Sequence, residues 1–197
     1  MKKFLFVFTV LGFFLFSQSV SAQTIRNAII IGASASQIDG DGVGGFDKVG
    51  LVFGGSSTFK VSENFSFQPE ILWLQKGSKR ADSLTFFKWR LNYVSVPVLV
   101  NYKIQPKFTL QGGLAFDYLI DAKLDEGYGF FDRTEDLNKF DLGYTAGIEY
   151  RIWDNLAANA RYQYSFFWLR DLGFKNSNVV VTLRLYLGGN QPGQPAS

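Results

Sequence analysis

Cysteine and histidine are both absent from the 197-residue chain. Without cysteine there is no disulfide framework, no thiol chemistry and no cysteine that could carry a lipid anchor. Without histidine the chain lacks the commonest general base and a common metal ligand. Hydrolases that pair a histidine with serine or aspartate are excluded. We therefore predict that the protein is not an enzyme and has no catalytic residue, cofactor or metal site.

Long hydrophobic runs are also scarce, and the one near the start is short. The chain opens "MKKFLFVFTVLGFFLFSQSVSAQ", in which Lys2 and Lys3 precede an apolar segment at 4–16 and a small-residue cleavage site at 20–22. Those 13 apolar residues fall short of the roughly 20 that span a bilayer as a helix. We predict a signal peptide at 1–22 and, beyond it, no membrane-spanning helix.

The chain as a whole carries little net charge. The formal net charge is +3, and removal of Lys2 and Lys3 with the signal peptide lowers it to +1. No cluster of basic residues accompanies the high isoelectric point, so we expect no nucleic-acid partner. Proline is rare, with 5 residues, whereas aromatic residues make up 17% of the chain. This composition favours long β-strands over disorder.

Hydrophobic residues alternate with polar or small ones along most of the chain. The clearest segment is 140–152, "FDLGYTAGIEYRI", where every second residue is apolar and the residues between are polar or small. A helix cannot give this period of two. Similar patterns predict strands at 26–37, 49–60, 65–76, 91–102, 108–120, 140–152, 156–168 and 179–187. Most of these strands have 12 or 13 residues, whereas strands of globular proteins usually have about five or six. Strands that cross a bilayer are longer, as these are.

The connections between these strands alternate in length. Tight turns are expected at 61–64, 105–107 and 153–155, and long loops at 38–47, 77–88, 121–139 and 170–177. An up-and-down barrel gathers its short turns at one end, as outer-membrane barrels do on the periplasmic side. Both termini then lie at the short-turn end.

The two faces of the strands indicate what surrounds the barrel. One face is aromatic and branched, and the other is small and polar, which suits the crowded interior of eight strands better than a solvent face. We predict an all-β, eight-stranded antiparallel up-and-down transmembrane β-barrel over 23–187, with a flexible tail at 188–197. The alternative is a soluble periplasmic barrel that binds an apolar ligand inside. Aromatics expected at the membrane interfaces are Trp73, Trp89, Tyr102, Tyr150, Trp153 and Trp168.

Charged residues occur on the predicted inner face. They are Glu70, Asp117, Asp141, Glu149, Arg151, Arg161 and Arg184. Because an isolated charge there is costly, we expect a paired network that fills the lumen. The alternative is a gate or a narrow channel for small solutes. Pro69 and Pro97 interrupt predicted strands, and we expect a bulge or kink at each.

The predicted outer loops carry opposite charges. Loop 76–90 is basic and loop 121–139 is acidic, so the two are expected to contact each other or a partner. Tyr128, Phe130 and Phe131 in the acidic loop are the candidate partner-binding residues. Outer-membrane lipid and lipopolysaccharide are the other expected partners. The segment "DGDGVGG" at 39–45 lacks the ligands of a calcium loop, and we predict no calcium site there.

Two proline motifs carry a family resemblance. "FSFQPEILWLQKGSK" followed by "LNYVSVPVLVNYKI" resembles the porin-like outer-membrane β-barrel family related to PorT, which is common in Bacteroidota, and the likeness covers about 26–187. The resemblance implies an outer-membrane barrel with a structural or accessory role. The resemblance also implies an alternative role, that of an accessory subunit of a secretion system. The tail "GGNQPGQPAS" departs from barrels that end at an aromatic residue of the last strand.

Overall fold

Strands make up most of the chain that the computed structural model describes, which is residues 25–40, 45–81, 86–168 and 173–187. In chain order the elements are β1 (Ile25–Asp39), β2 (Lys48–Lys60), β3 (Phe65–Lys76), β4 (Lys79–Ala81), β5 (Phe86–Gln105), β6 (Phe108–Asp125), β7 (Phe130–Asp132), the 3-10 helix η1 (Thr134–Asp136), β8 (Phe140–Arg151), β9 (Leu156–Ser165) and β10 (Lys175–Leu187). The predicted signal peptide and the predicted tail lie outside the described residues.

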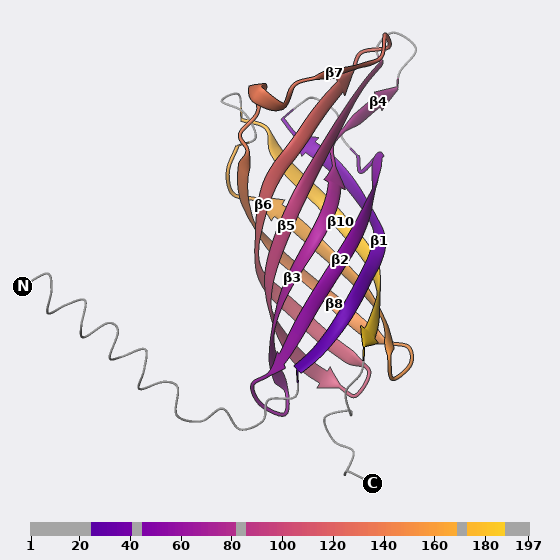
Figure 1. Cartoon of the computed structure of the whole chain (residues 1–197), viewed down its shortest axis with the longest axis vertical. Coiled ribbons are helices and arrows are strands. Elements are labelled where there is room, and N and C mark those ends of the chain that lie inside the picture. Colours follow the sequence, from indigo (N-terminus) through magenta and orange to yellow (C-terminus); the bar gives the residue numbers. More distant parts are fainter. Residues whose placement is uncertain (1–24, 41–44, 82–85, 169–172, 188–197) are drawn as a thin grey trace, which may run out of the picture.

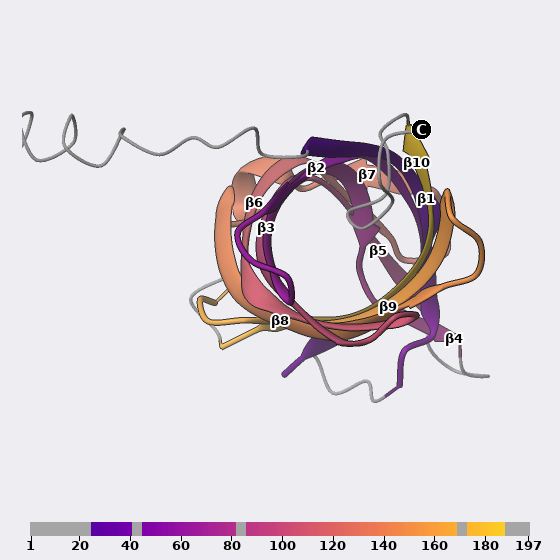
Figure 2. The ribbon, with the colours of Figure 1, turned by 90° about the horizontal axis from the view of Figure 1, so that it is seen from below.

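Eight of these strands close into a barrel. Around the wall the order is β1, β2, β3, β5, β6, β8, β9 and β10, and β1 pairs with β10 to complete the ring. All neighbouring pairs are antiparallel. Figure 1 shows the tilted strands from the side, and Figure 2 shows the closed ring from one end. The predicted eight-stranded up-and-down barrel is confirmed.

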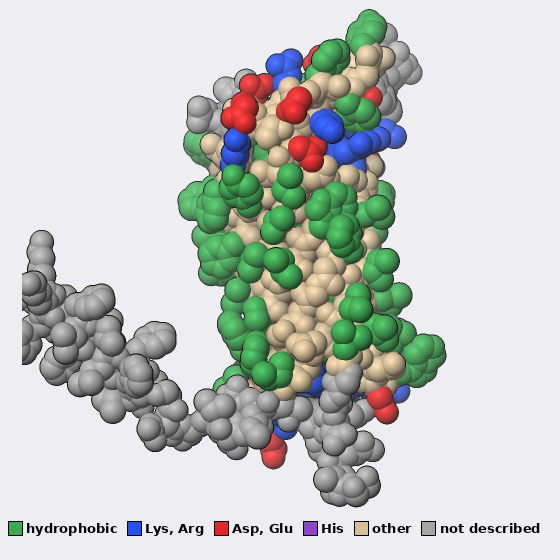
Figure 3. Space-filling model, viewed as in Figure 1, with side chains coloured by type: hydrophobic (Ala, Val, Ile, Leu, Met, Phe, Trp, Pro, Cys, Tyr) green, Lys and Arg blue, Asp and Glu red, His purple; other side chains and the backbone are tan. Residues whose placement is uncertain are grey.

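The apolar face of the barrel is its outside. Along β3 the side chains of Phe67 and Ile71 are exposed, whereas Gln68, Glu70 and Leu72 are buried. Hydrophobic side chains cover most of the height of the barrel on the side shown in Figure 3. A soluble barrel with an apolar ligand inside needs the reverse arrangement. Among the described residues, no helix is long and apolar enough to cross a membrane.

The end opposite the short turns is more ordered than predicted. β5 begins at residue 86 rather than 91, β6 continues to 125 rather than 120, and the short strands β4 and β7 pair with them. Together β4, β5, β6 and β7 extend beyond the rim of the barrel (Figure 1). On the other wall, β9 ends at 165 and β10 begins at 175, each a few residues earlier than expected. The long-loop end therefore carries a sheet extension as well as loops.

A β-bulge marks the point where this extension leaves the barrel. Asn92 pairs with Asp121, but Tyr93 pairs with Leu119, so Ile120 is the extra residue on β6. A bulge reverses which residues of a strand face inward and increases its local twist. Beyond Ile120 the inward residue is accordingly Ala122, which is fully buried.

Of the bulge or kink expected at each proline, the bulge is wrong. β2 and β3 pair on both sides of Pro69 in one register, from Ser56–Glu70 to Phe59–Phe67. β3 and β5 likewise keep one register across the gap opposite Pro97. Proline has no amide hydrogen, so each removes ladder bonds on one side only. The neighbouring pairs hold the register, and no residue is inserted.

Candidate functional site: the lumen and its two ends

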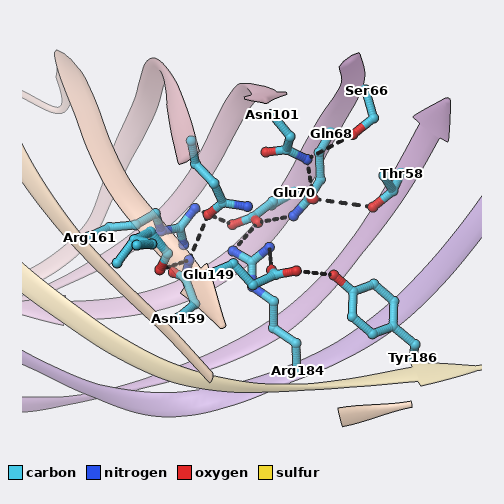
Figure 4. Close-up of polar contacts among 12 residues, drawn as sticks. Thr58, Ser66, Gln68, Glu70, Asn101, Glu149, Asn159, Arg161, Arg184 and Tyr186 are labelled. Carbon is cyan, nitrogen blue, oxygen red and sulfur yellow. Dashed lines mark hydrogen bonds and ion pairs between the residues drawn. The ribbon is translucent and has the colours of Figure 1, made fainter. Parts of the chain in front are cut away.

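An ion pair joins opposite walls of the barrel. Glu70 lies on β3 and Arg161 on β9, which stand four strands apart in a ring of eight and are therefore diametrically opposed. Arg161 Nη1 donates to Glu70 Oε2 at 2.8 Å, and Arg184 Nη2 of β10 donates to Oε1 at 2.6 Å. All three side chains are buried. Figure 4 shows both arginines converging on Glu70 in the lumen.

The contacts continue toward the short-turn end. Arg184 Nη1 lies 3.1 Å from Glu149 Oε2, and the Tyr186 hydroxyl donates to Glu149 Oε1 at 2.8 Å. Gln68 Nε2 donates to Glu70 Oε1 at 2.7 Å, the same oxygen that accepts from Arg184. Four of the seven charges predicted to form the network thus contact one another directly. A buried charge is tolerable only with partners of this kind.

A second set of polar contacts lies nearer the long-loop end. Lys76 Nζ and Gln163 Nε2 both donate to Asp117 Oδ2, at 2.6 and 2.7 Å. Directly across the β6–β8 ladder, Asp141 accepts from Ser165 and Asn176 and makes no ion pair with any described residue. The sequence interpretation had assigned Lys76 to the exposed basic loop, and this was wrong. Lys76 is the last residue of β3, faces inward and is fully buried.

Beyond these contacts the lumen is closed by apolar side chains. Leu91 and Tyr93 of β5 pack with residues from β1 and β6 and with the segment after η1. The buried members are Ile38, Leu91, Tyr93, Leu119, Ala122 and Leu137, with Trp89 and Phe174 packed against them. We name this group the apolar seal. Asn176 Nδ2 also donates to the Tyr93 hydroxyl at 3.1 Å, from β10 to the opposite strand β5.

Trp89 therefore differs from its predicted role as a membrane-interface residue. It shares the inward side of β5 with Leu91 and Tyr93 and packs against the apolar seal. The alternation Phe87, Trp89, Leu91, Tyr93 in the sequence was the signal that could have placed it.

The remaining predicted interface aromatics lie on the outside. Trp73 stacks on Phe53 with ring centroids 5.0 Å apart. Toward the short-turn end, Tyr102 packs on Phe65 and Tyr150 on Phe108, each at 4.9 Å. Trp153 and Trp168 are exposed. Their role at the membrane interfaces stays a prediction.

Arg151 lies apart from the ion pairs of the lumen. It is half-buried at the end of β8 and forms no ion pair with any described residue. It lines a cavity of about 100 Å³ at the short-turn end, together with Arg26, Lys103 and Glu149. The position of Arg26 as an inward residue was not predicted, because the first strand has the least regular alternation.

A glycine makes the long arginine in the lumen possible. Gly147 stands directly opposite Arg161 in the β8–β9 ladder. A β-carbon there would collide with the Ala160 carbonyl oxygen and with the Arg161 side chain itself. Small residues on the inner face thus provide the space that the charged side chains fill.

The sheet extension carries a group of cations on one surface, which we name the outer platform. Lys79 pairs with Lys88, and Arg90 pairs with Lys123. Carboxylates lie opposite two of these cations on the other side, because Lys88 also pairs with Asp125 and Lys123 with Asp132. Lys123 Nζ lies 3.8 Å from Asp121 Oδ2, whereas Lys79, Lys88 and Arg90 form no ion pair with a described residue. The Arg90 guanidinium lies 4.3 Å from the centre of the Phe130 ring and Lys88 Nζ lies 5.8 Å from it. The platform comprises Lys79, Lys88, Arg90, Lys123 and Phe130. Basic side chains show as blue atoms above the apolar zone in Figure 3.

Lys48 adds a further cation below the platform, at the outer rim of the barrel. Its Nζ donates to the Val49 carbonyl at 2.7 Å and to Gln75 Oε1 at 3.3 Å. Its side chain is buried, and Lys88 and Arg90 add positive charge nearby. No carboxylate of the described residues forms an ion pair with it.

Three carboxylates of the acidic loop, Asp121, Glu135 and Asp136, form ion pairs within the loop. Lys139 donates to Glu135 at 2.8 Å, and Arg133 to Asp136 at 3.3 Å. Glu135 raises the pKa of Lys139. The basic and acidic segments meet through the pairing of β5 with β6 and through Phe130, and their described residues form no ion pair with one another. Of the three candidate partner-binding residues, Tyr128 is 91% exposed, and Phe130 and Phe131 are also exposed.

No metal centre was predicted, and the described residues contain no group of three acidic side chains placed to hold a metal ion. Asp39 accepts a hydrogen bond from Gln37, while residues 41–44 of the rejected calcium loop lie outside the described residues.

The family follows from a match over most of the chain. Residues 8–184 match the family model described as outer membrane protein beta-barrel domain. The chain belongs to this family. Membership places it in the outer membrane, within a class whose members are generally not enzymes. No curated protein matches the chain.

Solved structures show the same fold at low identity. Ail, the attachment invasion locus protein of Yersinia pestis, is 19% identical with a TM-score of 0.57 and covers 82% of this chain and 98% of its own. A second Ail structure, in complex with the heparin analogue sucrose octasulfate, is 20% identical with a TM-score of 0.57 over 83% and 99%. Neisserial surface protein A is 15% identical with a TM-score of 0.49 over 84% and 97%.

Proposed function

We propose that the protein is a sealed, non-enzymatic outer-membrane barrel whose outer surface recognises a partner. The observation that carries the seal is the contact between opposite walls, Glu70 with Arg161 and Tyr93 with Asn176, at two different heights of the lumen. Eight-stranded barrels are just wide enough for side chains to fill. The seal argues against the alternative of a narrow porin-like channel.

The orientation belongs to the same proposal. Residues 1–22 act as a signal peptide that is removed, residues 23–187 form the barrel, and residues 188–197 form a tail. The short turns and both termini face the periplasm, and the extension faces outward, as in other barrels with short periplasmic turns. Lipid and lipopolysaccharide surround the wall.

Conductance in planar bilayers tests the seal. The purified full chain is expected to give no single-channel steps under conditions in which a porin added to the same bilayer does. Regular steps of one size, dependent on protein concentration, would replace the sealed barrel with the channel alternative.

The outer platform favours an anionic ligand as the partner. Lys88 and Arg90 lie beside the Phe130 ring, and Lys79, Lys88 and Arg90 form no ion pair with a described residue. Cations without a carboxylate partner are available to the oxygens of a sulfate or phosphate group. Ail, which has the same fold, was solved with a sulfated sugar, so sucrose octasulfate is a suitable probe here.

Titration of the detergent-solubilised barrel with sucrose octasulfate tests this surface. The variant Lys88→Gln with Arg90→Gln is expected to bind at least about tenfold more weakly, a change of about 1.4 kcal/mol. The matched control, Arg133→Gln with Lys139→Gln, removes the same charge at the same end and is expected to bind as the parent does. An equal loss of affinity in the two double variants would mean that binding depends only on net charge and not on the outer platform.

The resemblance to PorT-related proteins keeps one alternative open, an accessory subunit of a secretion system. Tyr128, Phe130 and Phe131 are the surface through which such a subunit would bind. Affinity purification from the native outer membrane distinguishes the two roles. A stoichiometric protein partner lost in Tyr128→Ser supports the accessory subunit.

A further inference from the structure

The cavity at the short-turn end differs from the rest of the lumen in its charge. It is lined by four cations, Arg26, Lys60, Lys103 and Arg151, and by two carboxylates, Glu63 and Glu149. Glu149 is already engaged by Arg184 and by the Tyr186 hydroxyl. The cavity wall therefore carries positive charge that its own carboxylates do not offset.

Arg26 is held in place on two sides. Its guanidinium carbon lies 4.2 Å from the centre of the Tyr186 ring, and Nη2 donates to the Asp154 carbonyl at 3.0 Å. Only 8% of the residue is exposed. Tyr186 is in turn fixed by Glu149. A cation that is already ordered loses little conformational entropy when it binds a ligand.

The other three cations reach the cavity from different strands. Lys60 ends β2, Lys103 lies near the end of β5, and Arg151 ends β8. None of them forms an ion pair with a described residue. Positive charge thus surrounds the cavity from several walls. Arg26 is buried and Lys60 and Arg151 are half-buried, which limits screening by water, whereas Lys103 is exposed.

Neutral donors complete the lining. Thr58, Ser62, Ser66 and Asn101 border the same space. A volume of about 100 Å³ holds several water molecules, and hence one small polar group. Arginine forks and hydroxyl donors together are the usual partners of carboxylate and phosphate oxygens.

We propose that this cavity is a binding site for a single oxyanion, a phosphate or carboxylate group presented on the short-turn side of the membrane. The ligand lies between Arg26, Arg151 and Lys103, and its negative charge offsets their mutual repulsion. The site does not depend on the outer platform or on whether the lumen conducts. With the orientation proposed above, it opens to the periplasm.

Isothermal titration calorimetry of the full-length barrel in a nonionic detergent tests the site, with sodium phosphate and sodium acetate as probes in low-chloride buffer. Saturable binding of phosphate alone assigns a phosphate group, of acetate alone a carboxylate, and of both a site for either oxyanion. Absence of saturable binding of both probes into the millimolar range overturns the proposal.

A pair of double variants separates a built site from net charge. Lys103→Gln with Arg151→Gln is expected to weaken binding of the active probe at least about tenfold. Arg133→Gln with Lys139→Gln, which removes the same charge at the opposite end, is expected to leave it unchanged. Equal weakening in both overturns the site.

Nuclear magnetic resonance of the unmodified protein gives a second readout that needs no variant. The probe is expected to shift the side-chain Nε–H of Arg26 and Arg151 and the backbone amides near Lys103. Shifts spread evenly over both ends, or confined to the long-loop end, overturn the assignment. Calorimetry and magnetic resonance test the oxyanion site, whereas conductance tests the sealed lumen. Failure of one proposal is therefore distinguishable from failure of the other.

Discussion

The two ends of the lumen are built from the same strands but closed in different ways. At the long-loop end the inward residues of β5 are Leu91 and Tyr93, which pack into the apolar seal. At the short-turn end the same strand turns Asn101 inward, beside charged residues and a cavity. Inward and outward side chains alternate along β5 in the same way at both ends. The alternation thus determines which residues face the lumen, and the type of residue at each inward position determines how that end is closed. One end excludes water by packing, and the other holds charge that only a partner or solvent can offset.

The ionic layer between these ends is expected to give the largest effect. Glu70→Ala leaves Arg161 and Arg184 buried without their shared carboxylate. Breaking a buried ion pair in this way costs about 3–5 kcal/mol. Urea unfolding of the barrel in detergent, followed by tryptophan fluorescence, measures the change in the free energy of unfolding. Glu63→Ala, at an exposed turn position, is the control and is expected to change little. A similar small effect for both would mean that the ion pairs do not hold the walls together.

The apolar seal is expected to give a slightly smaller effect. Leu91 is fully buried, and truncation to alanine in a packed core costs about 2–5 kcal/mol. Glu70 and Leu91 belong to separate groups of contacts, so their effects should add to within about 0.5 kcal/mol in the double variant. Strong non-additivity in urea unfolding would mean that the two closures form one cooperative unit, and the contrast between the ends would fail.

Much of the fold could be predicted because it depends on a period that one sequence displays. The segment 140–152 separates its faces completely, and β8 occupies 140–151. The limits of strands at the long-loop end could not be predicted in the same way. The extension is held by pairing between β4, β5, β6 and β7, and the bulge at Ile120 breaks the period where the strands leave the barrel.

Which interior charges meet depends on the stagger between strands, and a single sequence does not contain it. Glu70 and Arg161 were placed on the inner face from alternation alone, but their contact across the lumen follows from the register of the whole ring. Lys76 was missed because it is the last residue of its strand, where a loop assignment is equally plausible from the pattern. Arg26 was missed because its strand alternates weakly.

Lys48 at the long-loop end is expected to give an effect of opposite sign. Its side chain is buried and forms no ion pair with a described residue, so Lys48→Met removes a buried and unpaired charge. The urea midpoint of Lys48→Met at neutral pH is expected to lie above that of the parent. Lys107→Met, at an exposed short turn, is the control and is expected to leave the midpoint unchanged. A lower midpoint in Lys48→Met would mean that its hydrogen bonds to Val49 and Gln75 outweigh the cost of the buried charge.

The smallest effect on stability is expected at the tip of the extension. Tyr128 is 91% exposed, and Tyr128→Ser should change the free energy of unfolding by no more than about 0.5 kcal/mol, as surface substitutions do. Neither closure of the lumen includes this residue, so conductance and urea unfolding should match the parent. If the tip serves recognition, the same variant should lose a co-purifying partner while remaining as abundant in the outer membrane. A clear loss of stability would instead mean that Tyr128 packs against the long-loop end. Tyr128 would then belong to the closed barrel and not to the exposed recognition surface.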